Sequence, residues 1–203
     1  MVSSQGAPLT YMRSNSQCAV RAGFLITVVC SAERWGITAR AAWEIVFDAS
    51  AAAEAKCGGE VVVRWMVPSN RTGDPAKVLG QARLAVEMVA EGRPVVSFGL
   101  HASEGQKADG SGPFPPEPFE QAFRVAAAGG LVSTPHAGEH LGHESCAAAV
   151  RVLGASRLLH GVRAAEDSAT MELLARERIC CGGYGVPHTQ HTCTYAANDH
   201  RLW

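Results

Sequence analysis

The chain has 203 residues, of which 47% are hydrophobic and 18% are charged, and its formal net charge is −1. This length predicts one domain, or one domain with a small appendage, and the balanced charge offers no cationic surplus for nucleic acid or anionic lipid. Seven scattered cysteines without C-x-x-C spacing suit a reducing compartment. We therefore expect a cytoplasmic globular protein that binds neither nucleic acid nor a membrane.

Residues 1–22 are polar and mixed, and we expect them to form a loose N-terminal segment. The apolar run Gly23–Cys30 that follows is far too short to span a bilayer. Arg13 and Arg21 ahead of it faintly imitate a secretory signal peptide. A buried strand over Phe24–Val29 explains the same run with fewer assumptions and is the favoured interpretation.

Strand and helix patterns alternate from there on. Thr38 suits the N-cap of an alanine-rich helix that closes at Gly58-Gly59, and Asp74 with Pro75 suits the start of another helix. In chain order, the predicted elements are a helix over 38–56, a strand over 61–67, a helix over 74–92, a strand over 94–100, a helix over 119–128, a strand over 131–134, a helix over 144–153, a strand over 157–159 and a helix over 169–176.

Strands that alternate with helices of this length indicate a parallel sheet with right-handed crossovers. The first strand is not followed by a Gly-x-Gly-x-x-Gly turn, which favours a barrel over a dinucleotide-binding fold. A closed eight-stranded barrel takes about 250 residues, and this chain offers only five or six strand patterns. We predict an α/β fold: an incomplete TIM-type (β/α) barrel with parallel strands over residues 23–181, followed by an irregular tail over 182–203.

A loop rich in glycine, serine and charged residues runs from His101 to Pro116, after the third strand. Loops at strand ends often carry substrate contacts, which makes His101 and Glu104 candidates for that task. A solvated loop accounts for the same residues and is the interpretation that we favour.

Two histidines each end a short apolar run, and one predicted helix separates them. His136 opens the motif His136-Ala137-Gly138-Glu139, and His160-Gly161 follows 24 residues later. Because the carboxyl ends of neighbouring parallel strands meet at one edge of the sheet, His136, Glu139 and His160 should face one cavity. Two imidazoles and a carboxyl group in such a cavity can hold a metal, donate a proton and position a water molecule.

These motifs together resemble the adenosine deaminase family of zinc-dependent purine deaminases. The resemblance covers roughly residues 35–181 and is much more specific than any one motif. The segments that carry it are Val96–Leu100, Pro115–Phe119, His136–Glu139, Leu158–Ala164 and Ile179–Cys181.

The resemblance implies a (β/α)8 barrel with one Zn²⁺ at the carboxyl ends of the strands. It implies that His136 is a zinc ligand and that Glu139 protonates a purine ring nitrogen. It further implies that His160 positions the zinc-bound water and helps to deprotonate it. The implied reaction is hydrolytic deamination of adenosine, or of a related aminopurine nucleoside, to the inosine-type product and ammonia.

The chain also departs from the family pattern. The family binds zinc with a His-x-His pair and a late aspartate besides the histidine matched by His136, and this chain contains no His-x-His pair. The C-terminal part with the family's paired aspartates is missing as well. Where the family often has glycines in the purine-contacting loop, this chain has His101–Glu104. We therefore expect a deaminase truncated at both ends, with a catalytically inactive remnant that has lost most zinc ligands as the alternative.

Three further expectations concern the rest of the chain. His140 and His143 should decorate a loop and the start of the next helix rather than bind metal. The missing strands should leave unpaired sheet edges and promote self-association. The tail has zinc-like spacing, and a metal-binding module there is a third hypothesis, although disorder or a shifted reading frame explains its composition equally well. Its candidate ligands are His188, His191, Cys193 and His200.

Overall fold

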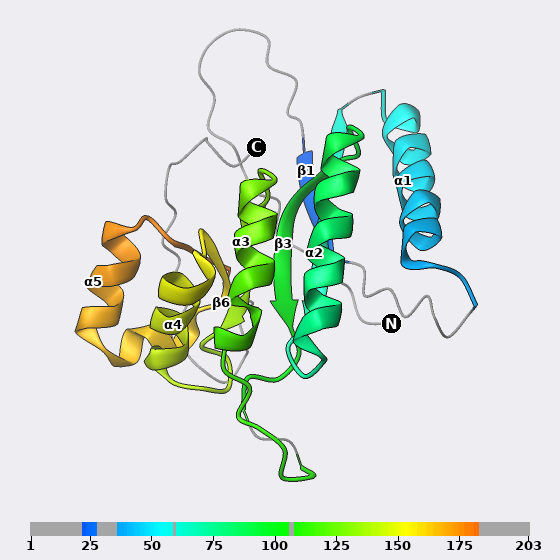
Figure 1. Ribbon diagram of the computed structural model, residues 1–203. Coiled ribbons are helices and arrows are strands. Elements are labelled where there is room, and N and C mark those ends of the chain that lie inside the picture. Colours follow the sequence, from blue (N-terminus) through cyan, green and yellow to red (C-terminus); the bar gives the residue numbers. More distant parts are fainter. Residues whose placement is uncertain (1–21, 28–35, 59, 106–107, 183–203) are drawn as a thin grey trace, which may run out of the picture.

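The computed structural model describes residues 22–27, 36–58, 60–105 and 108–182 (Figure 1). The predictions for the N-terminal segment before Ala22 and for the histidines of the tail lie outside the described residues. Within the described part of the chain, no helix is long and apolar enough to cross a membrane.

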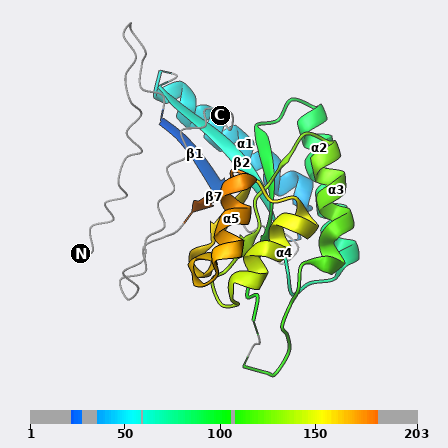
Figure 2. The ribbon, with the colours of Figure 1, turned by 90° about the vertical axis from the view of Figure 1, so that its left-hand side faces the viewer.

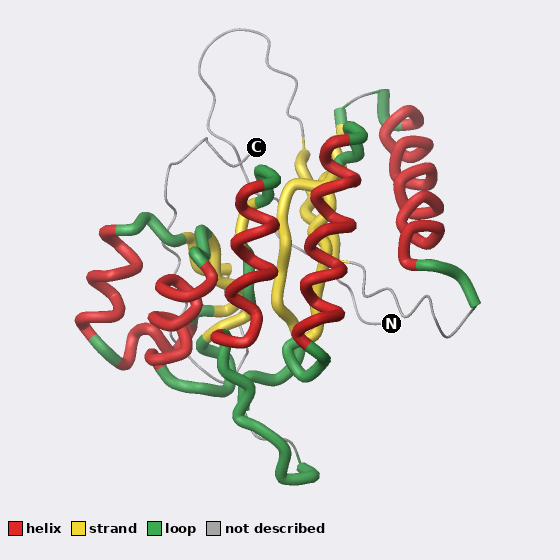
Figure 3. The backbone as a smooth tube through the Cα atoms, viewed as in Figure 1, coloured by secondary structure: helices red, strands yellow, loops and turns green. Residues whose placement is uncertain are grey.

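Strands and helices alternate along the described residues (Figure 3). The strands are β1 (Ala22–Thr27), β2 (Val61–Asn70), β3 (Val95–His101), β4 (Val132–Ser133), β5 (His136–Ala137), β6 (Arg157–His160) and β7 (Cys180–Gly182). The helices are α1 (Ala39–Lys56), α2 (Pro75–Ala90), α3 (Glu120–Ala128), α4 (His143–Leu153) and α5 (Ser168–Arg176), with the 3-10 helices η2 (Glu117–Phe119) and η3 (Val162–Glu166).

The strands form two parallel sheets, in the orders β1-β2-β3-β4 and β5-β6-β7. Within each sheet, every strand therefore lies beside its neighbour in the chain, as in a (β/α) barrel. The described strands do not close into a ring, which confirms the prediction of an incomplete barrel.

Pro135 separates β4, which lies within the predicted strand over 131–134, from β5, a short strand that the sequence did not predict. Proline has no N–H group for the strand ladder, so regular pairing stops at this residue. The two strands still connect the sheets, because the Thr134 N–H donates to the Phe98 carbonyl at 2.9 Å and the Leu159 N–H donates to the Pro135 carbonyl at 3.0 Å.

Helices α1, α2 and α3 pack on the first sheet, with α2 and α3 side by side in front of β3 (Figure 1). The predicted caps are present: Thr38 Oγ1 accepts from the Ala41 N–H, and Asp74 Oδ1 accepts from the Ala76 N–H. Aromatic residues at helical spacing belong to the core. Trp43 and Phe47 stack at 5.5 Å, and Phe123 meets Phe98 of β3 at 5.0 Å.

A second and smaller core lies between the second sheet and helices α4 and α5, the two helices nearest the viewer in Figure 2. It contains Ala137, Cys146, Leu158, Leu174 and Ile179. This cluster supports the segments that carry His136, Glu139 and His160, and so positions the predicted site.

The element bounds differ from the predictions at a few ends. β2 continues to Asn70, three residues beyond the predicted strand, because it keeps parallel partners on β3 up to His101. β7 includes Gly182, which the sequence analysis assigns to the tail.

Candidate active site

The structure brings the three predicted site residues together. His136 lies in β5, Glu139 follows it on the loop before α4, and His160 ends β6. The rings of His136 and His160 are 5.0 Å apart, and Glu139 Oε2 lies 3.5 Å from His160 Nε2. These side chains meet at the carboxyl ends of parallel strands, the edge at which α/β enzymes build their active sites.

His136 is held in one tautomer by the neighbouring strand. Its Nδ1 lies 3.1 Å from the carbonyl oxygen of Leu100 at the end of β3. A carbonyl only accepts hydrogen bonds, so Nδ1 carries the proton and Nε2 keeps its lone pair. Burial, and next the nearby charge of His160, lower the pKa of His136 and favour this neutral form. The ring is thus prepared to act as a base or a ligand through Nε2.

His160 occupies a tight turn. Its φ is +79° and that of Gly161 is +72°, so two successive residues adopt the left-handed conformation. A Cβ atom at position 161 would lie 2.7 Å from the Cys181 sulfur, which explains glycine there. The turn directs the His160 ring, which is 18% exposed, towards the half-open Glu139 carboxyl group.

His101 adds a third ring to this edge of the sheet. Its ring centroid lies 4.2 Å from that of His136, and its buried Nε2 has no hydrogen-bond partner within the described residues. Burial, reinforced by the charges of His136 and His160, lowers the pKa of His101 to about 3. His101 is therefore a neutral, half-buried side chain, and the prediction that it lies on a solvated loop is wrong.

The prediction of a solvated loop is also wrong for Glu104. Its side chain is fully buried, and its carboxylate accepts hydrogen bonds from the N–H groups of Gly138, Glu139 and His140 and from the Ser145 hydroxyl. With every donor supplied by the protein, it has neither the exposure of a solvated residue nor the free oxygen of a substrate contact. A charged residue in a glycine-rich loop gave no local sign of this role.

Arg71 is a further site-supporting residue that the sequence analysis does not identify. It is 2% exposed, and its guanidinium donates to the carbonyl oxygens of Phe114 and His136. Burial lowers the pKa of Arg71. The side chain connects the end of β2 to the long 101–116 loop and to β5, and no local sequence pattern marks such a contact.

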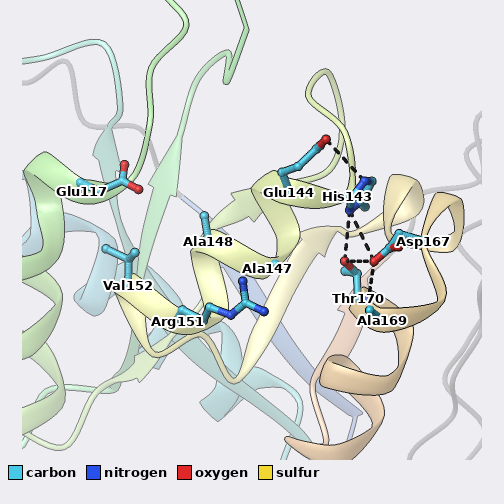
Figure 4. A pocket seen from close by; sticks show the side chains of 10 residues that line it. All are labelled: Glu117, His143, Glu144, Ala147, Ala148, Arg151, Val152, Asp167, Ala169 and Thr170. Carbon is cyan, nitrogen blue, oxygen red and sulfur yellow. Dashed lines mark hydrogen bonds and ion pairs between the residues drawn. The ribbon is translucent and has the colours of Figure 1, made fainter.

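His140 and His143 lie where they were expected. His140 is exposed on the loop, and His143 begins α4. The His143 ring belongs to a different, open surface pocket, where its Nδ1 lies 3.2 Å from Thr170 Oγ1 and 3.6 Å from Asp167 (Figure 4). The pocket is lined by Glu117, His143, Glu144, Ala147, Ala148, Arg151, Val152, Asp167, Ala169 and Thr170, and none of the three predicted site residues contributes to it.

The described residues do not assemble a metal site by themselves. Among them, no group of three or more His, Cys, Asp or Glu side chains is arranged to hold a metal ion. Catalytic zinc usually takes three protein ligands, and His136 Nε2 is a single well-oriented donor.

Comparison with known proteins gives one consistent result. The family model described as adenosine deaminase matches residues 19–183. A putative adenosine/adenine deaminase of Streptomyces virginiae is 38% identical over 140 residues, which are 68% of this chain and 38% of that protein. An aminodeoxyfutalosine deaminase of Streptomyces avermitilis is 34% identical over 175 residues, covering 84% of this chain and 46% of that protein. The chain thus spans less than half the length of these relatives.

Solved structures support the fold. An adenine deaminase from Arthrobacter aurescens superposes with a TM-score of 0.61 at 22% identity, covering 80% of this chain and 46% of that one. An amidohydrolase from Burkhoderia ambifaria, solved with bound Zn, superposes with a TM-score of 0.59 at 24% identity, covering 80% of this chain and 42% of that one.

Proposed function

The chain belongs to the adenosine deaminase family, and on that premise we propose that its site serves the hydrolytic deamination of an aminopurine nucleoside such as adenosine. Water replaces the exocyclic amino group of the purine, and the products are the inosine-type nucleoside and ammonia. The relatives named above as adenosine/adenine and aminodeoxyfutalosine deaminases support this substrate class.

One observation carries the proposal: the convergence of Glu139 and His160 beside His136. The Glu139 carboxyl group and the His160 ring are 3.5 Å apart, and they reach the same space from the loop after β5 and from the end of β6. Deamination needs a proton donor at a ring nitrogen and a proton acceptor for the attacking water, and this pair supplies one acid and one base.

The two residues then divide the proton transfers between them. Glu139, when protonated, donates to the purine ring nitrogen and so removes the negative charge that water attack would place on the ring. His160 accepts a hydrogen bond from the attacking water and takes its proton. His160 passes this proton to the departing amino group, which leaves as ammonia, and the proton of the new ring hydroxyl returns to Glu139 as the carbonyl forms.

The described residues offer one ligand for a zinc ion, His136. We assign His136 Nε2 as one ligand, because the Leu100 carbonyl fixes the ring with that lone pair free. The remaining ligands are not present among the described residues, which hold no suitable group. The same observation favours a second candidate function, an inactive deaminase-like protein that keeps the fold without the metal.

Turnover distinguishes the two candidates. The protein supplied with Zn²⁺ should convert adenosine to inosine, followed as a fall in absorbance at the adenine band. Glu139→Gln should lower kcat by about 10²–10⁴-fold, the usual contribution of a general acid. The control, Glu172→Gln on the exposed surface of α5, should leave kcat unchanged. A wild-type protein without turnover supports the inactive candidate.

Metal analysis tests the ligand assignment separately. The zinc retained after dialysis should fall in His136→Ala, whereas His140→Ala, which alters an exposed ring, should leave it unchanged. Equal zinc content in the two variants contradicts the assignment of His136.

A further inference from the structure

Glu104 is a buried carboxylate whose partners all lie on one segment of the fold. Oε1 accepts from the Gly138 N–H at 3.0 Å and from the Ser145 hydroxyl. Oε2 accepts from the Glu139 N–H at 2.8 Å and from the His140 N–H at 3.1 Å. Three successive backbone N–H groups thus converge on one side chain, in the manner of an anion-binding nest.

The carboxylate is charged in this environment. Burial alone raises the pKa of Glu104, but the hydrogen bonds from Ser145 and from the three backbone N–H groups outweigh it and leave the pKa below its ordinary value. Only the ionised form offers acceptors to all four donors, because a protonated carboxyl group would point an O–H towards one of them.

The loop that Glu104 holds is fixed from its other side as well. The carbonyl oxygens of Gly138 and His140 accept from the Arg163 N–H and the Arg163 guanidinium, and the Gly161 N–H donates to the Ala137 carbonyl. Glu104 comes from the preceding βα loop, where its own carbonyl accepts from the Phe114 N–H at 2.9 Å. The 138–140 segment is therefore clamped between two neighbouring βα loops.

This clamp acts on the backbone of the residue that faces His160. The Glu139 N–H is bound to Glu104, while the Glu139 carboxyl group reaches His160 Nε2. The side-chain direction of Glu139 thus depends on a backbone conformation that Glu104 stabilises.

We propose that Glu104 is a positioning residue, which orders the Gly138–His140 loop and thereby directs Glu139 towards His160 and the substrate. The inference rests on the proposed deamination for its catalytic consequence, but its structural part stands on the contacts alone. Glu104 itself does not touch the reacting atoms.

The structural part is tested in Glu104→Gln by amide hydrogen exchange and NMR. Glutamine keeps the shape but offers one acceptor oxygen and turns an NH2 group towards the backbone donors. The exchange of the amides of residues 138–140 should accelerate by roughly tenfold or more, while the amides of β2 and β3 keep their protection. The His160 ring resonances should shift in the same direction as in Glu139→Gln, because both changes take a carboxylate away from Nε2.

A folded Glu104→Gln protein with unchanged exchange at residues 138–140, or with an unmoved His160 ring, overturns the proposal. If Glu104→Gln does not fold, Ser145→Ala takes its place, because it removes only the hydroxyl donor. It should show a smaller acceleration of exchange at residues 138–140 and a smaller shift of the His160 ring resonances. The control is Glu172→Gln, an exposed carboxylate with the same chemical change.

The catalytic part is read from kinetics. Glu104→Gln should lower kcat by about 10²-fold, the cost of a displaced catalytic group, with little change in KM. A rise in KM of this size with an unchanged kcat contradicts a role through Glu139. A wild-type protein with no turnover rejects the proposed function while leaving the exchange and NMR results to decide the clamp.

Discussion

Gly138 shows how one residue type fixes the geometry of the site. Its φ is +67°, and a Cβ atom there would lie 2.3 Å from the sulfur of Cys146, which is fully buried in the second core. Burial raises the pKa of Cys146 to about 12, so this thiol is an inert packing group under the loop. Glycine at 138 thus lets the loop lie directly on α4, with its N–H groups turned to Glu104.

Gly138→Ala should therefore destabilise the fold. The left-handed conformation costs an alanine about 1–2 kcal/mol, and the clash with Cys146 adds overpacking strain. Urea unfolding should show a loss of at least about 2 kcal/mol. The matched control is Gly80→Ala within α2, where nothing lies within 4 Å of the new Cβ atom. There the helix should gain about 0.5–1 kcal/mol. Equal stability of the two variants would contradict the packing argument.

Glu104 should make stability depend on pH. Its folded pKa lies below the ordinary value of 4.5, so its contribution is complete above pH 4.5 and is lost as the pH falls through the folded pKa. The ionisable groups that interact with it are Arg71, Arg163 and Cys146. The arginines stay charged over this range, and the thiol stays neutral.

The measurement compares wild type with Glu104→Gln by urea unfolding between neutral pH and pH 3. The difference in unfolding free energy should be largest at neutral pH and should shrink below pH 4.5, because only the wild type has a carboxylate at position 104 that can be protonated. A difference that stays constant with pH would show that the carboxylate charge is not what the loop requires.

The residues of the site were only partly predictable. His136, Glu139 and His160 could be found because each follows an apolar run, and neighbouring parallel strands end at one edge. Glu104 could not, because its contacts join residues 34 to 41 positions apart and a polar loop residue has no local signature of burial. Whether His101 lies in water or against His136 depended on the same long-range packing.

At the scale of elements, local sequence signals determine where helices begin. The Asp74 side chain accepts from the Ala76 N–H at 2.8 Å, and Pro75 occupies the first turn of α2. Asp74→Ala should lower the unfolding free energy by about 1 kcal/mol through the loss of this cap. The control, Asp48→Ala on the exposed side of α1, should change it by less than about 0.5 kcal/mol. Thermal unfolding of both variants at one pH measures the difference.

Strands were predicted less completely than helices, for a physical reason. The run Val61–Val67, rich in β-branched residues, marked the start of β2. The last three residues of β2, 68–70, carry no strand signal and are extended because they pair with β3. Beyond the predicted strand over 131–134, Pro135 interrupts the ladder, and the short strand β5 follows it. Pairing with β3 thus set the end of β2, and the N–H group that Pro135 lacks set the end of β4.

At the scale of the whole molecule, the described sheets are open. β1 pairs only with β2, and β7 pairs only with β6 within the described residues. Unpaired strand edges bind other strands, so this chain should self-associate or show low solubility. Sedimentation velocity over a range of concentrations tests this expectation. A monodisperse monomer at all concentrations would contradict it.

The order of the strands has a consequence for synthesis on the ribosome. Within each described sheet, every new strand pairs with the one translated just before it, so no existing pair has to separate to admit it. A nascent polypeptide can therefore build each sheet stepwise, one βα unit at a time, because the strands that pair are neighbours in the sequence.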